Sequence, residues 1–146
     1  MKTELKWNQK MQFTGSIEGS QVSLDSKPPL GSGQGFTPKE LVAIGLSGCT
    51  AMDVIALLKK YKEPVETLEV DTEVEASDSG HPIVFKSILL KFKATGQIVP
   101  EKLIEAITLS QTQYCGVSAM LSKSVPINYE VSLNGNKVTE GLAHFK

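Results

Sequence analysis

Residues 41–58, LVAIGLSGCTAMDVIALL, form an almost unbroken apolar run that constrains the fold more than any other segment of the chain. Helix-start signals stand directly before it. Thr37 suits the N-cap, Pro38 suits the first helical position, and Glu40 completes a capping box with Thr37. The run therefore predicts one long helix, and its apolar character on almost every side predicts burial on several faces. A domain of 146 residues rarely surrounds a helix so completely, so we expect a second chain to cover it, most simply in a twofold dimer.

The same run approaches the length of a membrane span, but polar residues interrupt it. Asp53 lies near its middle, and an unpaired aspartate at that depth of a bilayer costs about 2.5–3.5 kcal/mol. The N-terminal residues MKTELKWNQK contain no apolar stretch typical of a signal peptide. A formal net charge of −1 argues against nucleic acid or an anionic membrane as a partner. We therefore expect a cytoplasmic protein with reduced thiols, no membrane partner and no nucleic-acid partner.

Strand patterns flank the apolar run on both sides. Alternation of polar and apolar residues predicts a three-stranded meander (TELKWNQKMQFTGSI and SQVSLD), a long hairpin (VETLEVDTEVEA and PIVFKSILLKFKATG) and a last strand (INYEVSLNG). Pro100 starts a second helix, with a break near Gly116 and an end at Pro126. The order βββ-α-ββ-α-β indicates one α+β domain over residues 1–146, with an antiparallel sheet, long buried cysteine-bearing helices and a loosely held tail at 136–146.

The chain has two cysteines, Cys49 in the long helix and Cys115 in the second one. There is no C-x-x-C motif, and His81 and His144 lack zinc-type spacing, so the sequence predicts no metal site and no cofactor. Free cysteine is often a small buried hydrophobe. The neighbours of Cys49 are unusually small, however, and leave room above the sulfur for a substrate. Both interpretations of Cys49, as packing residue and as nucleophile, stay open on this ground.

A nucleophilic Cys49 needs a positive charge nearby, because the reactive form is the thiolate. Cys49 lies about three turns beyond the helix start, too far for the helix dipole to help, and the carboxylate of Asp53 at i+4 disfavours a second negative charge. All fifteen basic residues are lysines. The candidate cations are therefore Lys6 or Lys10 in the first hairpin and Lys39 at the helix start, and Asp53, Lys10 and Lys39 are candidate supporting residues.

The segments TPKELVAIGLSGCTAMDV and QTQYCGVSAML resemble the two cysteine motifs of the OsmC/Ohr family, the osmotically inducible and organic hydroperoxide resistance proteins. The resemblance covers roughly residues 3–133. It implies an intertwined homodimer with the cysteine helices at its centre, and a thiol-dependent peroxidase. In that chemistry Cys49 reduces a hydroperoxide and becomes a sulfenic acid, Cys115 resolves it to a disulfide, and a dithiol reductant restores both thiols.

Two departures from the family pattern place the chain in an OsmC-like branch. Family members use an arginine and a glutamate at the thiolate, and this chain has no arginine. Lys39 stands where the glutamate is expected, with Glu40 one residue later, so Glu40 is the candidate third catalytic residue. Low peroxidase activity is therefore one expectation. The alternatives are a non-enzymatic dimer that binds a small apolar ligand or senses redox state, and a structural dimer with inert cysteines.

Overall fold

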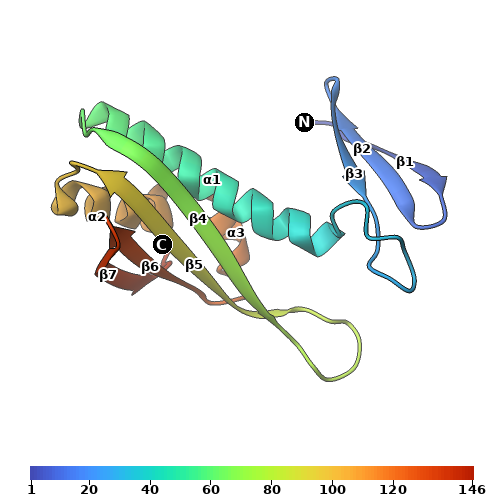
Figure 1. Ribbon diagram of the computed structural model, residues 1–146. Helices are drawn as coiled ribbons and strands as arrows, with labels where there is room; N and C mark the ends of the chain where they lie inside the picture. The colour runs from blue at the N-terminus through green and yellow to red at the C-terminus, as the bar shows by residue number, and fades with distance from the viewer. The chain divides into compact units, whose positions relative to one another are not determined.

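The computed structural model describes residues 1–146, which divide into two compact units, 1–42 and 43–146. The single domain predicted from the sequence therefore contains two separately packed parts. Helix α1 (Pro38–Lys60) begins in the first unit and lies mostly in the second, so the boundary falls inside the helix (Figure 1).

The first unit is the predicted antiparallel meander. Its strands are β1 (Glu4–Gln9), β2 (Gln12–Ile17) and β3 (Ser20–Leu24), paired in that order. The sheet is thin, and every residue of β1 is exposed. Leu5 and Trp7 each keep 63% of their surface exposed, so this unit leaves large apolar side chains uncovered within one chain.

The loop that follows β3 is organised by Asp25, whose exposed fraction is only 3%. Its carboxylate accepts hydrogen bonds from the amides of Ser26 (2.7 Å), Ser32 (3.2 Å) and Gln34 (3.3 Å), and from the Ser32 hydroxyl at 2.5 Å. These bonds, the Ser32 hydroxyl first, lower the pKa of Asp25. No sequence signal singled out the Asp25 carboxylate that holds this loop together.

The second unit contains a four-stranded sheet in the order β4-β5-β6-β7. Strands β4 (Val65–Ala76) and β5 (Phe85–Gly96) form the predicted hairpin, and the last two strands are β6 (Ile127–Leu133) and β7 (Asn136–Leu142). Strands β5 and β6 pair in parallel, so the prediction of an antiparallel sheet was wrong for this pair. The helical segment between them supplies the crossover connection that a parallel pair requires.

Residues 136–142 form β7 instead of part of a loose tail. Asn134 (φ 50°) and Gly135 (φ 84°) turn the chain, and β7 then pairs antiparallel with β6. An Asn-Gly pair is a strong hairpin signal, because both positions of the favoured turn need positive φ. Ala143 beyond the strand is buried, with 7% of its surface exposed. The prediction of a loosely held tail was wrong for these residues.

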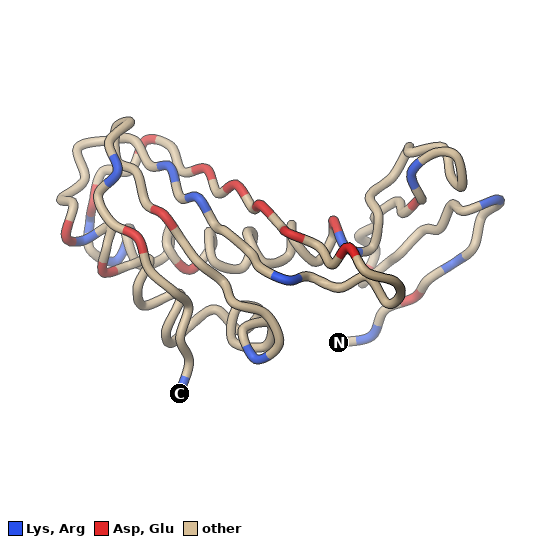
Figure 2. The backbone as a smooth tube through the Cα atoms, turned by 90° about the horizontal axis from the view of Figure 1, so that it is seen from below, with Lys and Arg blue, Asp and Glu red and all other residues tan.

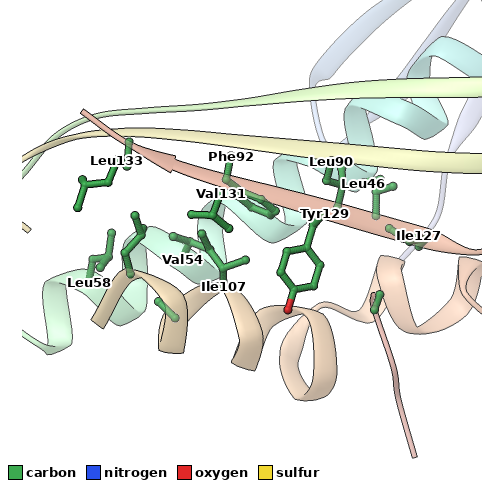
Figure 3. Close-up of a cluster of buried hydrophobic side chains, with 14 of the residues drawn as sticks. Leu46, Val54, Leu58, Leu90, Phe92, Ile107, Ile127, Tyr129, Val131 and Leu133 are labelled. Carbon is green, nitrogen blue, oxygen red and sulfur yellow. The ribbon is translucent and has the colours of Figure 1, made fainter. Parts of the chain in front are cut away.

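Helix α1, helix α2 (Pro100–Leu109), the π-helical segment η1 (Ser110–Tyr114) and helix α3 (Gly116–Leu121) lie on one face of this sheet (Figure 1). The core lies between helices and sheet, as the labelled side chains in Figure 3 show. Alternate residues of the central strands point into it: Ile88, Leu90, Phe92 and Ala94 of β5, and Ile127, Tyr129, Val131 and Leu133 of β6.

The opposite face of the sheet is charged. Lys91 and Lys93 of β5 pair across to Glu73 and Asp71 of β4. Figure 2 shows a line of acidic residues along one long strand, with basic residues on the strand beside it. This alternation of apolar and charged positions is the pattern that predicted the hairpin from the sequence.

Helix α1 is buried along one line only, through Leu46, Thr50, Val54 and Leu58. Within the single chain the sheet and α2 cover one side of the helix, so burial of its other sides by a second chain stays a prediction. Ile44 and Met52 keep 48% and 75% of their surface exposed. Helix α1 is long and apolar enough to cross a membrane. Buried core helices of soluble proteins can have the same length and composition, so these two properties alone do not indicate a membrane span.

Candidate functional site

Three of the residues singled out from the sequence meet at one place in the second unit. Cys49 lies half-buried on α1, and Cys115 is completely buried at the junction of η1 and α3. The two sulfur atoms and a carboxylate oxygen of Asp53 all lie within 4.8 Å of one another. The spacing of Cys49 and Asp53 follows from one turn of helix, but the arrival of Cys115 beside them depends on tertiary packing.

The π-helical segment positions Cys115. After Tyr114 the chain leaves the helical conformation, and Cys115 is extended, with φ −69° and ψ 101°. It serves as the N-cap of α3, and its sulfur accepts a hydrogen bond from the Ser118 amide at 3.3 Å. The break predicted near Gly116 is confirmed, and it lies one residue earlier, at Cys115. Single-turn π segments often occur at functional sites, where they displace a side chain from the regular helical path.

A chain of buried side-chain hydrogen bonds joins α1 to the π segment. The Ser110 hydroxyl donates to Asp53 Oδ2 at 3.0 Å and lies 2.8 Å from the Thr50 hydroxyl. Because the single proton of Ser110 goes to Asp53, Thr50 is the donor in the second contact. Gln111 Nε2 donates to Thr50 Oγ1 at 2.7 Å, and the Ser118 hydroxyl donates to Gln111 Oε1 at 3.1 Å. Every bond therefore runs in one direction, from Ser118 toward the carboxylate.

Sequence reasoning missed four members of this network: Thr50, Ser110, Gln111 and Ser118. Thr50 carried a detectable signal, because it occupies an apolar position of the four-residue repeat that buries α1. A polar group at such a position needs a buried partner. The partner itself was not predictable, since Ser110 is 60 residues away in the sequence.

Burial raises the pKa of Cys115 to about 11. The hydrogen bonds from Ser118 oppose this shift, and the neighbouring Cys49 adds to it. Near neutral pH, Cys115 is therefore a protonated thiol in the reduced protein.

Glu40 has a structural role in the first unit. The Thr37 amide donates to Glu40 Oε2 at 2.8 Å, and the Glu40 amide donates to Thr37 Oγ1 at 3.3 Å, which confirms the predicted capping box. Lys27 pairs with the other carboxylate oxygen at 3.0 Å. The Thr37 amide first, and then Lys27, lower the pKa of Glu40. The catalytic role expected for Glu40 stays a prediction.

The two candidate lysines also belong to the first unit. Lys10 lies in the turn between β1 and β2, where its carbonyl accepts a hydrogen bond from the Trp7 indole at 2.9 Å. Lys39 lies exposed in the first turn of α1. Neither side chain forms an ion pair, and no lysine pairs with Asp53. The structure of each unit by itself therefore gives the two thiols no positively charged partner.

Residues 31–130, which include both cysteines and Asp53, match the family model described as OsmC-like protein. This chain belongs to the OsmC-like family. Protein YhfA of Escherichia coli strain K12 is 33% identical over 135 residues, which cover 90% of this OsmC-like chain and 98% of the relative. The family assignment made from the two cysteine motifs is confirmed.

Solved structures agree on the fold. The OsmC-like protein from Mycoplasma pneumoniae superposes with a TM-score of 0.80 at 18% identity, covering 90% of this chain and 95% of that one. The organic hydroperoxide resistance protein OhrB of Bacillus subtilis superposes with a TM-score of 0.66 at 15% identity, covering 90% and 96%. The α+β class predicted for this OsmC-like chain is therefore confirmed.

The site geometry of this OsmC-like chain suits reversible thiol chemistry. A disulfide has an S–S bond of about 2.05 Å, so sulfur atoms within 4.8 Å must approach by less than about 3 Å. Cys49 is the more accessible of the two thiols, and Cys115 has no exposed surface. An external oxidant therefore meets Cys49 first.

Proposed function

We propose that this protein is a thiol-dependent organic hydroperoxide reductase, with Cys49 as the peroxidatic cysteine and Cys115 as the resolving cysteine. The observation that carries the proposal is the pair of sulfur atoms within 4.8 Å, one half-buried and the other completely buried. Membership of the OsmC-like family supports it, as does the similarity in fold to a protein named for organic hydroperoxide resistance.

The first step oxidises Cys49. Its thiolate attacks the terminal, hydrogen-bearing oxygen of the hydroperoxide, the O–O bond breaks, and the other oxygen leaves as an alkoxide that takes a proton from water to become an alcohol. Cys49 becomes a sulfenic acid, which is the reversible first stage of cysteine oxidation. Cys115 is not the attacking group, because burial raises its pKa to about 11 and keeps it protonated.

The second step forms the disulfide. The Cys115 sulfur attacks the Cys49 sulfur, the S–O bond breaks, and hydroxide leaves as water once it has gained a proton. Cys115 must lose its own proton for this attack. The Asp53 carboxylate, which lies within 4.8 Å of both sulfurs, is the base that we propose for it. A dithiol reductant then exchanges twice with the disulfide, which restores both thiols and oxidises the reductant.

We propose a homodimer that covers the exposed side of α1. Ile44 and Met52 are exposed on this helix, and a Cβ added at Gly45 or Gly48 would meet no heavy atom within 4 Å. This combination of apolar side chains and open glycine positions suits close approach of a second chain. A cytoplasmic location, where thiols stay reduced, is part of the same proposal.

In this proposal a lysine supplies the positive charge for the Cys49 thiolate, and Lys10 and Lys39 are the candidates to be tested by substitution. Both are free of ion pairs within their own unit and are therefore available to another group. A lysine supplies the charge but not the planar two-point contact of an arginine, so we expect slow turnover relative to arginine-containing family members.

The test is consumption of cumene hydroperoxide by metal-free protein with a dithiol as reductant. Cys49→Ser should abolish turnover, and Cys115→Ser should consume about one equivalent and then stop or over-oxidise. Lys10→Ala or Lys39→Ala should slow the first step at least about tenfold, whereas the exposed control Lys123→Ala should leave it unchanged. Equal rates in the wild type and in Cys49→Ser would contradict the proposal and favour an inert or purely ligand-binding dimer.

A further inference from the structure

The cluster of Cys49, Asp53 and Cys115 has the composition of a metal site as well as that of a redox pair. Cys49 and Asp53 lie one turn apart on α1, and Cys115 arrives from the end of η1. Each residue offers one ligand atom, and the three atoms lie within 4.8 Å of one another. Tetrahedral Zn²⁺, with Zn–S of about 2.3 Å and Zn–O of about 2.0–2.2 Å, places its ligand atoms roughly 3.6–3.8 Å apart. Each pair of atoms therefore needs to close by at most about 1.2 Å.

The ligand atoms of the cluster suit a cation. Two thiols and a half-buried carboxylate lie together, and Asp53 has no ion-pair partner. The chain contains no arginine that could reach them. A divalent metal ion supplies positive charge at a place where no ion pair within the second unit provides it, and two sulfur ligands select a thiophilic ion over Mg²⁺ or Ca²⁺.

Hydrogen bonds already orient two of the three ligands. Ser110 donates to Asp53 Oδ2, which leaves Oδ1 without a hydrogen bond and available to a metal ion. The Ser118 amide donates to the Cys115 sulfur at 3.3 Å. Thr50 and Gln111 connect these two donors through buried hydrogen bonds, so both ligands are held by one network. Outer contacts of this kind fix ligand geometry in known metal sites.

We propose that the reduced protein binds one Zn²⁺, or a similar thiophilic divalent cation, through the sulfur atoms of Cys49 and Cys115 and one oxygen of Asp53. Water occupies the fourth position. The thiols release their protons on binding, and the metal undergoes no redox change. A Cys49–Cys115 disulfide removes two of the three ligands, so metal binding and disulfide formation exclude each other. The inference rests on the geometry of the cluster and does not require peroxidase activity.

The test uses Co²⁺ as a spectroscopic probe and Zn²⁺ in competition with a chromophoric chelator, both on reduced, metal-stripped full-length protein. We expect one metal ion per chain, a thiolate-to-cobalt charge-transfer band and intense tetrahedral visible bands. Cys49→Ser or Cys115→Ser should weaken the charge-transfer band and lower Zn²⁺ affinity at least about a hundredfold. Asp53→Asn should lower it about ten- to a hundredfold, whereas the exposed control Asp78→Asn should bind as the wild type does.

Two controls keep the test decisive. Circular dichroism melts of each variant show whether it is folded, and Asn at position 53 keeps an oxygen that can accept from Ser110. Alkylation of the half-buried Cys49 in the wild type should release the metal while the circular dichroism spectrum stays unchanged. Absence of the charge-transfer band in folded, reduced wild type would overturn the proposal, and so would wild-type affinity in Asp53→Asn or Cys49→Ser.

Discussion

The backbone amide of Ser118 donates a hydrogen bond to the Cys115 sulfur over 3.3 Å, and the Ser118 hydroxyl donates to Gln111 over 3.1 Å. Ser118 therefore joins the buried cysteine to the polar network that runs through Thr50 and Ser110 to Asp53. The sulfur is fixed in position by the same contacts that hold α1 against η1. Stability of the fold and position of the thiol consequently depend on one set of side chains.

Thr50→Val should destabilise the protein by about 1–3 kcal/mol, because it keeps the shape of the side chain but removes the hydroxyl between Ser110 and Gln111. Urea denaturation measures the change. Thr67→Val is the matched control, since the Thr67 hydroxyl pairs with Thr95 at an exposed position and water can replace it. We expect a change within about 0.5 kcal/mol there. Equal effects of the two substitutions would show that the buried network adds no stability.

The reduced, metal-free protein should lose stability above about pH 9. Burial raises the pKa of Cys115 to about 11 in the native state, and an unfolded cysteine ionises near 8.5. Between these values the unfolded chain has released a proton that the native state retains, so rising pH favours unfolding by about 1.4 kcal/mol per pH unit. Below about pH 8.5 both states are protonated and this effect is absent.

The measurement is urea denaturation at several pH values in the wild type and in Cys115→Ser. Serine also caps helices well, so the variant should keep the N-cap of α3 and lose only the thiol titration. The difference in free energy of unfolding between the two proteins should therefore change with pH above about 9. A difference that stays constant up to pH 11 would contradict the raised pKa of Cys115.

Asp53→Asn should slow disulfide formation more than sulfenic acid formation. The carboxylate is the proposed base for Cys115, and general-base assistance is typically worth about 10²–10⁴ in rate. Rapid quenching followed by intact mass measurement separates the two steps, and sulfenic acid should accumulate in the variant. The deficit should shrink toward pH 11, where Cys115 ionises without help. Slowing of the first step alone would assign Asp53 a different role.

Met52→Glu should dissociate the proposed dimer, because 75% of Met52 is exposed in a single chain and a carboxylate there would be buried against the partner. Light scattering coupled to gel filtration should give twice the chain mass for the wild type and the chain mass for the variant. Glu66→Lys, on the exposed face of β4, is the charge-changing control and should stay dimeric. A monomeric wild type at micromolar concentration would contradict the dimer.

The sequence predicted the elements well where a local signal existed. Thr37 and Glu40 marked the start of α1, and alternation of apolar and charged residues marked β4 and β5. The parallel pairing of β5 with β6 was not predictable in the same way, since it depends on how the intervening helices pack. The Asn134–Gly135 turn that creates β7 does carry a local signal, because an Asn-Gly pair favours a hairpin turn.

The site was only partly predictable, because some of its contacts follow from local sequence and others depend on tertiary packing. Cys49 and Asp53 share one helix face by their spacing, so their proximity follows from local geometry. The approach of Cys115, and the hydrogen bond from Thr50 to Ser110 across 60 residues, are results of tertiary packing. The π-helical segment that displaces Cys115 from the helix has no simple sequence signature.

The most direct test of the proposed function is to treat reduced, metal-free protein with one equivalent of cumene hydroperoxide, block the remaining thiols and map the peptides by mass spectrometry. The proposed function predicts a Cys49–Cys115 disulfide within one chain, formed in proportion to the peroxide added. It also predicts that Cys115→Ser retains an oxidised Cys49. Two fully alkylated thiols after peroxide treatment would contradict the proposed reaction.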